Sequence, residues 1–376
     1  MKPKLIIVGS GFFGATIANL CASRLGIPVS VYEKRNHIGG NAYSYFDEKT
    51  KIEIHKYGSH LFHTSNLKVI EYISEFAEFN RYRHTVKSKH GNAFYTMPIN
   101  LSTISSIYGV ALNPLEAMRL IKDEAGKAGI VDPEANLRDK AISLVGHKLY
   151  EALIESYTHK QWQTSPVDLP ADIITRLPVR FNFDDSYFDD EFQGLPVNGY
   201  EDVFKNMLAN TNIEVKLDCD FFQQNYPSDT PIVYTGALDR FFNYKYGRLT
   251  WRTLDFETER FQGLSDFQGG AVVNYADLNE KFTRIHEFKH LHPEREWSAD
   301  TVIMREFSRF ALGDDEPYYP VNSAEDRIKL HEYRKLASET SNVYFGGRLG
   351  TYKYLDMHAA IASAIALFEN KLKHVL

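Results

Sequence analysis

Three glycines near the start of the chain have the spacing of a dinucleotide-binding turn. Gly9, Gly11 and Gly14 follow the apolar residues 4–8 and precede a helical pattern over residues 15–25. In such a strand–turn–helix unit, the first glycine allows the tight turn, the second lets a pyrophosphate approach the backbone, and the third lets the helix pack on the strand. The amides at the helix N-terminus then face the phosphates. The spacing therefore predicts a phosphate-binding turn.

An acidic residue follows at the distance expected of a ribose-binding carboxylate. The strand pattern of residues 28–32 ends at Glu33, where a carboxylate can accept hydrogen bonds from both ribose hydroxyls. Arg35, Gly39 and Gly40 come next, and this arrangement resembles the FAD-binding fold of amine oxidases and their relatives. Since NAD-binding dehydrogenases have no need of a second glycine pair at this place, we expect FAD rather than NAD.

Aromatic and basic residues gather around a loop pattern in the middle of the chain. Tyr157 and Trp162 precede the proline-containing residues 163–172, and Arg176 and Arg180 follow them. An aromatic ring can stack on a base, and guanidinium groups can bind phosphate oxygens, so this segment is a candidate nucleotide-diphosphate site. Buried tryptophans and surface arginines are common without a ligand, so ordinary packing is the alternative.

Two histidines, His60 and His63, form a further dense spot in the sequence. A protein metal site needs at least three ligands from the chain, and the sequence shows no third ligand beside these two. We therefore expect no metal site, and we interpret both histidines as residues beside a cofactor or packed in the protein.

The elements that must position these residues fall into three kinds. Helical patterns cover residues 114–128 and 137–157, with Asn113 and Asn136 as N-caps. Short alternating, aromatic-rich segments between residues 245 and 310 indicate an antiparallel sheet. We therefore expect an α/β fold, in which an FAD-binding Rossmann-like domain has a helical insertion domain and an antiparallel β-sheet domain.

The cofactor domain is expected to be assembled from separated segments. Two later strand-then-glycine patterns, residues 231–236 and 342–350, are similar to the first one. The expected domains are residues 1–95, 194–244 and 326–376 for FAD binding, residues 96–193 for the helical insertion with a mobile substrate loop around 163–180, and residues 245–325 for the substrate-binding sheet.

The composition excludes several classes of protein. A net charge of −6 in 376 residues provides no general basic surface for nucleic acid or anionic lipid, so an anionic ligand must be met by a few placed arginines. Two cysteines, Cys21 and Cys219, are too few for a disulfide framework or a cysteine-based metal site. The early apolar run ends in a glycine turn, so it is neither a signal peptide nor a membrane span. We expect a cytoplasmic protein without nucleic-acid or membrane partners.

Eight strings of the sequence, in their order and joint occurrence, resemble bacterial UDP-galactopyranose mutases. They are residues 9–14, 33–41, 57–64, 157–162, 176–183, 192–200, 233–239 and 346–357, and the resemblance extends over essentially the whole chain. It implies an isomerase that interconverts UDP-galactopyranose and UDP-galactofuranose with no net redox change, through a covalent flavin N5–sugar intermediate on reduced FAD. It also implies a homodimer, NADPH or NADH as the reductant, and a role in supplying galactofuranose for cell-surface polysaccharide.

The resemblance assigns roles to three sets of residues. Arg176 and Arg284 are the expected catalytic residues, because they would stabilise the negative charge that grows on the leaving UDP. The expected substrate-binding residues are His84, Tyr157, Trp162, Tyr187, Asn274, Tyr319 and Tyr354. The expected cofactor-binding residues are Gly9, Gly11, Phe12, Phe13, Gly14, Glu33, Lys34, Arg35, Gly40, Asn41, His60, His63, Arg348, Asp356 and Met357.

Two positions depart from the family pattern and leave the sugar and nucleotide preference open. His84 stands where an asparagine is usual, and His358 stands where an acid is common. The alternatives are a mutase for a related sugar nucleotide such as UDP-N-acetylgalactosamine, a flavin amine oxidase-like oxidoreductase, and a non-enzymatic nucleotide-binding regulator.

Overall fold

The computed structural model describes residues 3–174, 177–227 and 229–376. The chain forms two compact units. The first unit consists of Met1–Arg81, Asp190–Thr253 and Ala311–Leu376, and the second of Tyr82–Asp189 and Leu254–Phe310. The helices expected as an insertion and most strands of the expected antiparallel sheet therefore lie together in the second unit.

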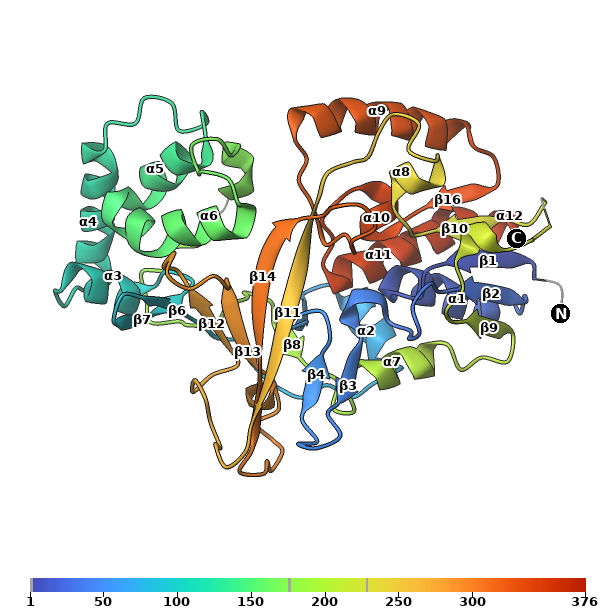
Figure 1. Ribbon diagram of the computed structural model, residues 1–376, viewed down its shortest axis with the longest axis horizontal. Coiled ribbons are helices and arrows are strands. Elements are labelled where there is room, and N and C mark those ends of the chain that lie inside the picture. Colours follow the sequence, from blue (N-terminus) through green and yellow to red (C-terminus); the bar gives the residue numbers. More distant parts are fainter. Residues whose placement is uncertain (1–2, 175–176, 228) are drawn as a thin grey trace. The chain divides into compact units, whose positions relative to one another are not determined.

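A five-stranded parallel sheet organises the first unit (Figure 1). Its order is β16 (Val343–Phe345), β10 (Ile232–Tyr234), β1 (Leu5–Val8), β2 (Val29–Tyr32) and β9 (Ile213–Lys216). Leu5, Ile6 and Ile7 are completely buried, as expected for a parallel strand that is covered on both faces. The three strand-then-glycine patterns of the sequence thus become three adjacent strands, β16, β10 and β1.

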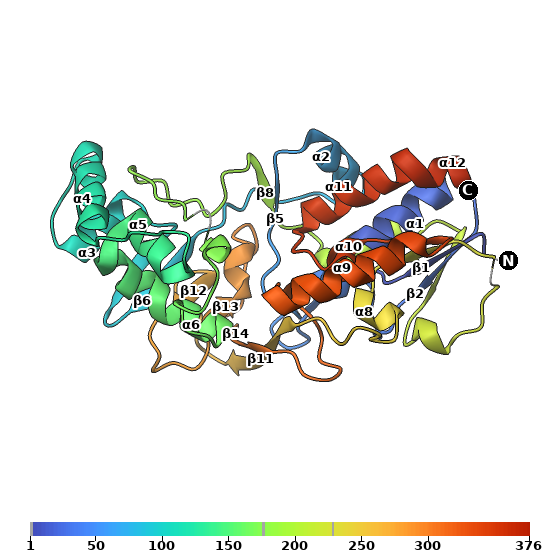
Figure 2. The same ribbon diagram turned by 90° about the horizontal axis from the view of Figure 1, so that it is seen from above.

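Helix α1 (Phe12–Arg24) begins directly after the glycine turn and packs along α11 (Met357–Leu367) (Figure 2). Its residues are apolar on nearly all sides, and most of them are buried, which is typical of a helix enclosed between a sheet and a second helix. The other helices of this unit are α2 (Leu67–Ser74), α7 (Tyr200–Met207), α8 (Leu238–Phe241), α9 (Ala324–Glu339), α10 (Gly347–Thr351) and α12 (Lys373–Val375). Two short strand pairs complete it, β3 (Ser44–Phe46) with β4 (Glu53–His55) and β5 (Phe62–Thr64) with β8 (Phe192–Gly194).

The second unit contains a mixed sheet in the order β11-β14-β13-β12-β6-β7. These strands are β11 (Trp251–Phe261), β14 (Thr301–Phe310), β13 (Arg284–Glu287), β12 (Val272–Tyr275), β6 (Val86–His90) and β7 (Ala93–Met97). β11 begins in the first unit, where its first two residues pair with β15 (Tyr319–Pro320). The pairs β14–β13 and β13–β12 are antiparallel as predicted. β6 and β7, which lie outside the expected sheet segment, also pair antiparallel, whereas β12 and β6 run parallel.

The helices of the second unit are α3 (Leu101–Tyr108), α4 (Pro114–Lys127), α5 (Leu137–Tyr150) and α6 (Ser156–Trp162). Asn113 and Asn136 cap α4 and α5 as predicted, and Asn113 forms a reciprocal capping box with Glu116. The helical pattern of residues 137–157 is interrupted twice, by a kink at Gly146 with a φ of +77° and by a π-helical turn over Glu151–Glu155. The helices α5 and α6, which flank the π-helical turn, both contribute residues to the same apolar core.

The described part of the chain contains no helix that is both long and apolar enough to cross a membrane. The early apolar run instead forms the strand β1 (Leu5–Val8), which is too short for such a role.

Candidate active site

A cavity of about 650 Å³ lies in the first unit where β1 meets α1. Its volume is in the range of ligand sites, and it extends from the ends of β1, β2 and β10 to the start of α11. All but one of the expected cofactor-binding residues line it, namely Gly9, Gly11, Phe12, Phe13, Gly14, Glu33, Lys34, Arg35, Gly40, Asn41, His60, Arg348, Asp356 and Met357. The exception is His63, which lies outside the lining.

The backbone at the glycine turn leaves no room for side chains. Gly9 has a φ of +101°, and a Cβ atom there would lie 2.2 Å from Oγ1 of Thr235. A Cβ atom on Gly40, whose φ is +57°, would lie 3.1 Å from the Cα atom of Gly11. Only glycine adopts such conformations without strain, so a phosphate can approach the bare amides at the start of α1.

Glu33 is fixed at the end of β2 by three hydrogen bonds. Its Oε2 accepts from the backbone N–H and the hydroxyl of Ser10, at 2.9 and 2.7 Å, and its Oε1 accepts from the backbone N–H of Arg35, at 3.0 Å. The residue is 95% buried yet lines the cavity. Such a carboxylate still has acceptor capacity for the hydroxyl groups of a ribose.

Arg35 extends a guanidinium group along the same cavity. Its Nη2 donates to Oδ1 of Asn41 and to Oε2 of Glu316, both at 2.8 Å, and the group stacks over the ring of Tyr57. Burial opposes ionisation of Glu316, but Arg35 and Lys34 hold the pKa of that carboxyl below its usual range. The other terminal nitrogen of Arg35, Nη1, is buried and has no hydrogen-bond partner among the described residues. It is a donor suited to an anionic ligand.

Arg348, which lines the cavity, packs against the half-buried Tyr319 and the exposed Tyr354. Its Nη2 donates to the backbone carbonyl of Leu355 at 2.7 Å, and its guanidinium lies 4.8 Å from the ring centre of Tyr354. Tyr354 donates to Oδ1 of Asp356 at 2.8 Å, and its ring lies 5.8 Å from that of Tyr319. The structure therefore brings together four of the residues that the sequence singled out, Arg348, Tyr319, Tyr354 and Asp356.

The second unit holds another group of expected residues, centred on Arg284 at the start of β13. Nη2 of Arg284 donates to the hydroxyl of Tyr157, and Nε lies 3.4 Å from Oε1 of Glu306 on the neighbouring strand β14. Asn274, on the strand β12 at the other side, stands at the same register as Arg284. The side-chain oxygen of Asn274 is buried without a hydrogen-bond partner in the described chain. This group presents a cation flanked by a phenol and an amide.

Glu306 is a buried carboxylate that lies between the guanidinium of Arg284 and the imidazole of His286. Its Oε2 lies 3.1 Å from Nε2 of His286, and the residue is 96% buried. Burial alone would raise its pKa, but Arg284 and then His286 hold the pKa of the Glu306 carboxyl at about 2. Burial lowers the pKa of His286 and raises that of Tyr157 to about 12. At neutral pH the group therefore contains one ionised arginine and one ionised carboxylate, with a neutral phenol beside them.

Two aromatic residues from distant segments meet elsewhere in the second unit. His84 is buried, and its ring lies 5.4 Å from that of the half-exposed Tyr187. The backbone N–H of Tyr187 donates to the carbonyl oxygen of His84 at 2.7 Å. Trp162, at the end of α6, instead packs against the apolar core of the helices. The surroundings of Trp162 therefore agree with ordinary packing in the core, which was the alternative to a role in nucleotide binding.

Comparison with known proteins identifies the family. The sequence profile of the UDP-galactopyranose mutase family matches residues 152–354, and that of an NAD(P)-binding Rossmann-like domain matches residues 7–76. A probable UDP-galactopyranose mutase of Klebsiella pneumoniae is 40% identical over 99% of this chain and 95% of its own length. The chain belongs to the UDP-galactopyranose mutase family. It is therefore an isomerase, and the resemblance seen in the sequence is confirmed.

Other relatives and solved structures agree with this membership in the UDP-galactopyranose mutase family. A dTDP-fucopyranose mutase of Escherichia coli is 39% identical over 99% of both chains, and a UDP-galactopyranose mutase of Mycoplasma genitalium is 34% identical over 96% and 93%. A crystal structure of reduced UDP-galactopyranose mutase has a TM-score of 0.75 at 14% identity and covers 98% of this chain and 94% of its own. At this identity the structural likeness shows the fold, and the predicted α/β class with a Rossmann-like domain is confirmed.

One expected catalytic residue, Arg176, lies outside the residues that the structure describes. The structure adds residues of this family member that sequence reasoning missed, above all Glu306 and His286 beside Arg284. A signal was present, because both are polar residues at positions of a strand pattern that should face the interior. Their partners could not be predicted without the strand register.

Proposed function

We propose that the chain interconverts the pyranose and furanose forms of UDP-galactose, with reduced FAD in the cavity of the first unit. The single observation that best supports FAD is this cavity, whose lining includes the glycine turn, Glu33 and Arg35 with its unpartnered Nη1. Glycine backbone and a guanidinium suit a pyrophosphate, and a carboxylate suits a ribose. When bound and reduced, FAD would supply the nucleophile for the anomeric carbon of the sugar.

The residues of this chain would bind and neutralise the nucleotide. Arg284 would stabilise the negative charge that develops on UDP as the glycosidic bond breaks, and Arg176 is proposed for the same role. Tyr157 and Glu306 hold the Arg284 guanidinium at two of its nitrogens. Tyr319, Tyr354, Asn274, Tyr187 and His84 are proposed as further substrate contacts. No buried general base is required of the protein in this scheme.

The test is to incubate the purified flavoprotein with UDP-galactofuranose, with and without dithionite, and to separate the products by chromatography. We expect UDP-galactopyranose to form only with the reduced protein. Turnover of an amine with release of peroxide, and no pyranose from the reduced protein, would show that the chain is an amine oxidase-like enzyme instead.

The Arg284→Ala variant tests the role of the arginine. Losing a charge-assisted phosphate contact that tightens in the transition state is expected to cost roughly 2–4 kcal/mol in kcat/KM. The bound flavin should keep its absorbance spectrum, because Arg284 lies in the second unit and the cavity in the first. A colourless Arg284→Ala protein would contradict this assignment.

A second candidate function is the mutase reaction on a deoxythymidine diphosphate sugar. The observation that favours it is the relative from Escherichia coli, named dTDP-fucopyranose mutase, which is 39% identical over 99% of both chains. The values of kcat/KM for UDP-galactopyranose, UDP-N-acetylgalactosamine and dTDP-fucopyranose, measured on one preparation, decide between the substrates. The homodimer and NADPH or NADH as the reductant stay predictions from the resemblance, and the cytoplasmic location stays a prediction from the sequence.

A further inference from the structure

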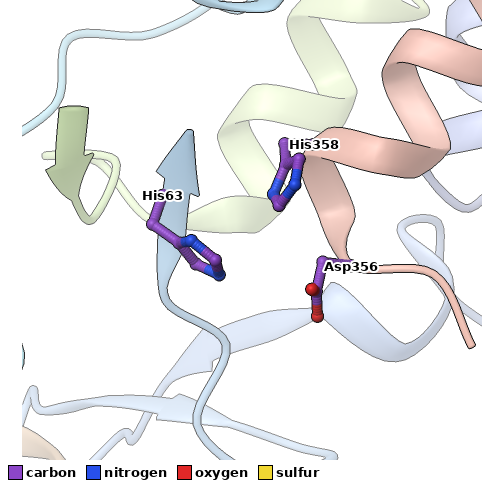
Figure 3. A group of neighbouring side chains, drawn as sticks. All are labelled: His63, Asp356 and His358. Carbon is purple, nitrogen blue, oxygen red and sulfur yellow. The ribbon is translucent and has the colours of Figure 1, made fainter. Parts of the chain in front are cut away.

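A second cluster of polar side chains lies in the first unit, beside the cavity that we propose for FAD. His63 on β5, Asp356 at the N-cap of α11 and His358 in the first turn of that helix each offer one ligand atom, and these atoms lie within 4.8 Å of one another (Figure 3). The rings of the two histidines are 5.0 Å apart. Figure 3 shows the ring of His63 directed from its strand toward the side where His358 and Asp356 lie.

His63 and Asp356 are each also held by a side chain outside the trio, and His358 is held by the backbone of His63. Nδ1 of His63 lies 2.6 Å from Oδ2 of Asp190, whose other oxygen accepts a hydrogen bond from the hydroxyl of Ser65. Oδ1 of Asp356 accepts from the hydroxyl of Tyr354 at 2.8 Å. The ring of His358 hydrogen-bonds the backbone of His63. In metal sites such outer partners fix the tautomer of a histidine, so that its second nitrogen presents a lone pair to the metal.

We propose that His63, Asp356 and His358 bind a divalent transition-metal ion, with zinc as the first candidate. Two imidazoles and one carboxylate form a ligand set that zinc takes in proteins, with a fourth position for water, whereas magnesium and calcium prefer oxygen ligands alone. Around zinc the ligand atoms of a tetrahedron lie roughly 3.3 Å apart, given bonds of about 2.0–2.1 Å. Small side-chain rotations would therefore close the present cluster around an ion.

The fold supplies what the sequence did not show. His63 has no third ligand near it in the sequence, and for this reason no metal site was expected there. The strand β5 and the helix α11 come from opposite ends of the chain and contact each other in the first unit. The ion would thus join β5 to the first turn of α11, and one of its ligands, Asp356, also lines the cofactor cavity.

A similar trio in the second unit provides a matched control. Asp266, Glu287 and His290 also place one ligand atom each within 4.8 Å of the others. There, however, the Glu287 carboxylate accepts hydrogen bonds from the backbone N–H groups of Phe267 and Gln268 and from the hydroxyl of Thr301. Its oxygens already hold the surrounding loop, so we expect this trio to bind no metal.

The experiment uses the full-length flavoprotein without a histidine tag, treated with a chelator and then dialysed against buffered zinc. We expect one zinc ion per chain in the parent protein and in the control His290→Ala, and loss of that ion in His358→Ala. Asp190→Asn, which removes the outer partner of His63, should weaken binding about 10- to 100-fold. Zinc-edge X-ray absorption, which the flavin does not mask, should show two imidazole nitrogens at about 2.0 Å.

The parent protein alone can overturn the proposal, whatever the folding of the variants. Fewer than one ion per two chains at micromolar free zinc, or an absorption spectrum without imidazole ligands, would exclude the site. Binding that survives in His358→Ala but disappears in His290→Ala would place the ion in the second unit and would equally refute it. Because metal content is measured and not turnover, the outcome is independent of the proposed mutase activity.

Discussion

Arg284 is held at two points of its guanidinium group, and this arrangement defines its direction. Nη2 of Arg284 donates a hydrogen bond to the hydroxyl of Tyr157, and Nε forms an ion pair with Glu306 on the adjacent strand. The buried carboxylate also offsets the charge of the arginine before any ligand binds. A phosphate that arrives beside Arg284 therefore meets a cation that is already oriented, which is how a preorganised site stabilises a transition state.

Glu306→Gln tests whether this orientation matters for turnover. The amide keeps the volume but loses the charge that faces Arg284, so we expect kcat/KM to fall roughly 10- to 100-fold, mainly in kcat. The control is Glu259→Gln, which removes the partner of Arg305 in an exposed pair on the same sheet and should change kcat less than about twofold. A merely structural role of Glu306 would lower the yield of folded protein and leave kcat per folded molecule unchanged.

The same carboxylate makes a pH-dependent contribution to stability. The pKa of Glu306 is about 2 in the folded protein and about 4.3 in an unfolded chain, so the unfolded state binds the proton more readily. The resulting stabilisation, on the order of 3 kcal/mol, is fully present above about pH 4.3 and is lost as the pH falls toward 2.

Urea unfolding of the parent and of Glu306→Gln between pH 6 and pH 2.5 measures this contribution. We expect the free energy of unfolding to fall more steeply with acid in the parent, so that the two proteins converge at low pH. Parallel curves over the whole range would show that the pKa of Glu306 is not depressed in the folded state.

At the scale of elements, a single lysine ties a helix of the second unit to the loop between β12 and β13. Nζ of Lys160 on α6 lies within hydrogen-bond distance of four backbone carbonyls and shares its three N–H donors among them. They are those of Tyr275, Asp277, Glu280 and Phe282, and the last three distances are 2.7, 3.1 and 3.1 Å. These carbonyls belong to the turn that leads from Asn274 to Arg284. The lysine therefore fixes the connection that positions two candidate substrate residues.

Lys160→Met should loosen this turn, because it leaves partly buried carbonyl groups without a donor. We expect a loss of about 2–3 kcal/mol in the free energy of unfolding and faster amide exchange over residues 276–283. The exposed Lys127, which pairs with Glu124 on a helix surface, gives the control Lys127→Met, with an expected change below about 0.5 kcal/mol. Equal exchange rates in both variants would mean that the turn holds its shape without Lys160.

The elements that local patterns define could be predicted, and those that long-range pairing defines could not. The turn at Gly9 and the caps at Asn113 and Asn136 depend on residues within a few positions. The spacing of these residues was therefore enough to predict the turn and both caps. The parallel pairing of β12 with β6 joins segments about 185 residues apart, at Val272 and Val86, and alternation of side chains does not encode a partner strand. Arg284 was implied by the resemblance alone. For want of the strand partners, the sequence indicated neither Glu306 nor the meeting of His63 with His358.

At the scale of the whole molecule, the cofactor cavity depends on segments from the beginning, the middle and the end of the chain. Gly9, Thr235 and Gly347 come from three such segments and all line it. A ligand that touches all three stabilises the first unit by binding only the folded form. None of the described residues of the second unit belongs to the lining, so the loss of the ligand should affect the two units differently.

Removal of the flavin tests this difference. With FAD at 100 times its Kd, binding stabilises the folded first unit by about 2.7 kcal/mol, so the flavin-free protein should show faster amide exchange in residues 9–14, 232–236 and 346–357. Exchange in α4 and α5 of the second unit should change little, which provides the internal control. Readdition of FAD should restore the slow rates, since the effect is one of binding and not of damage. Uniform acceleration across both units would instead indicate that the two units unfold as one cooperative body.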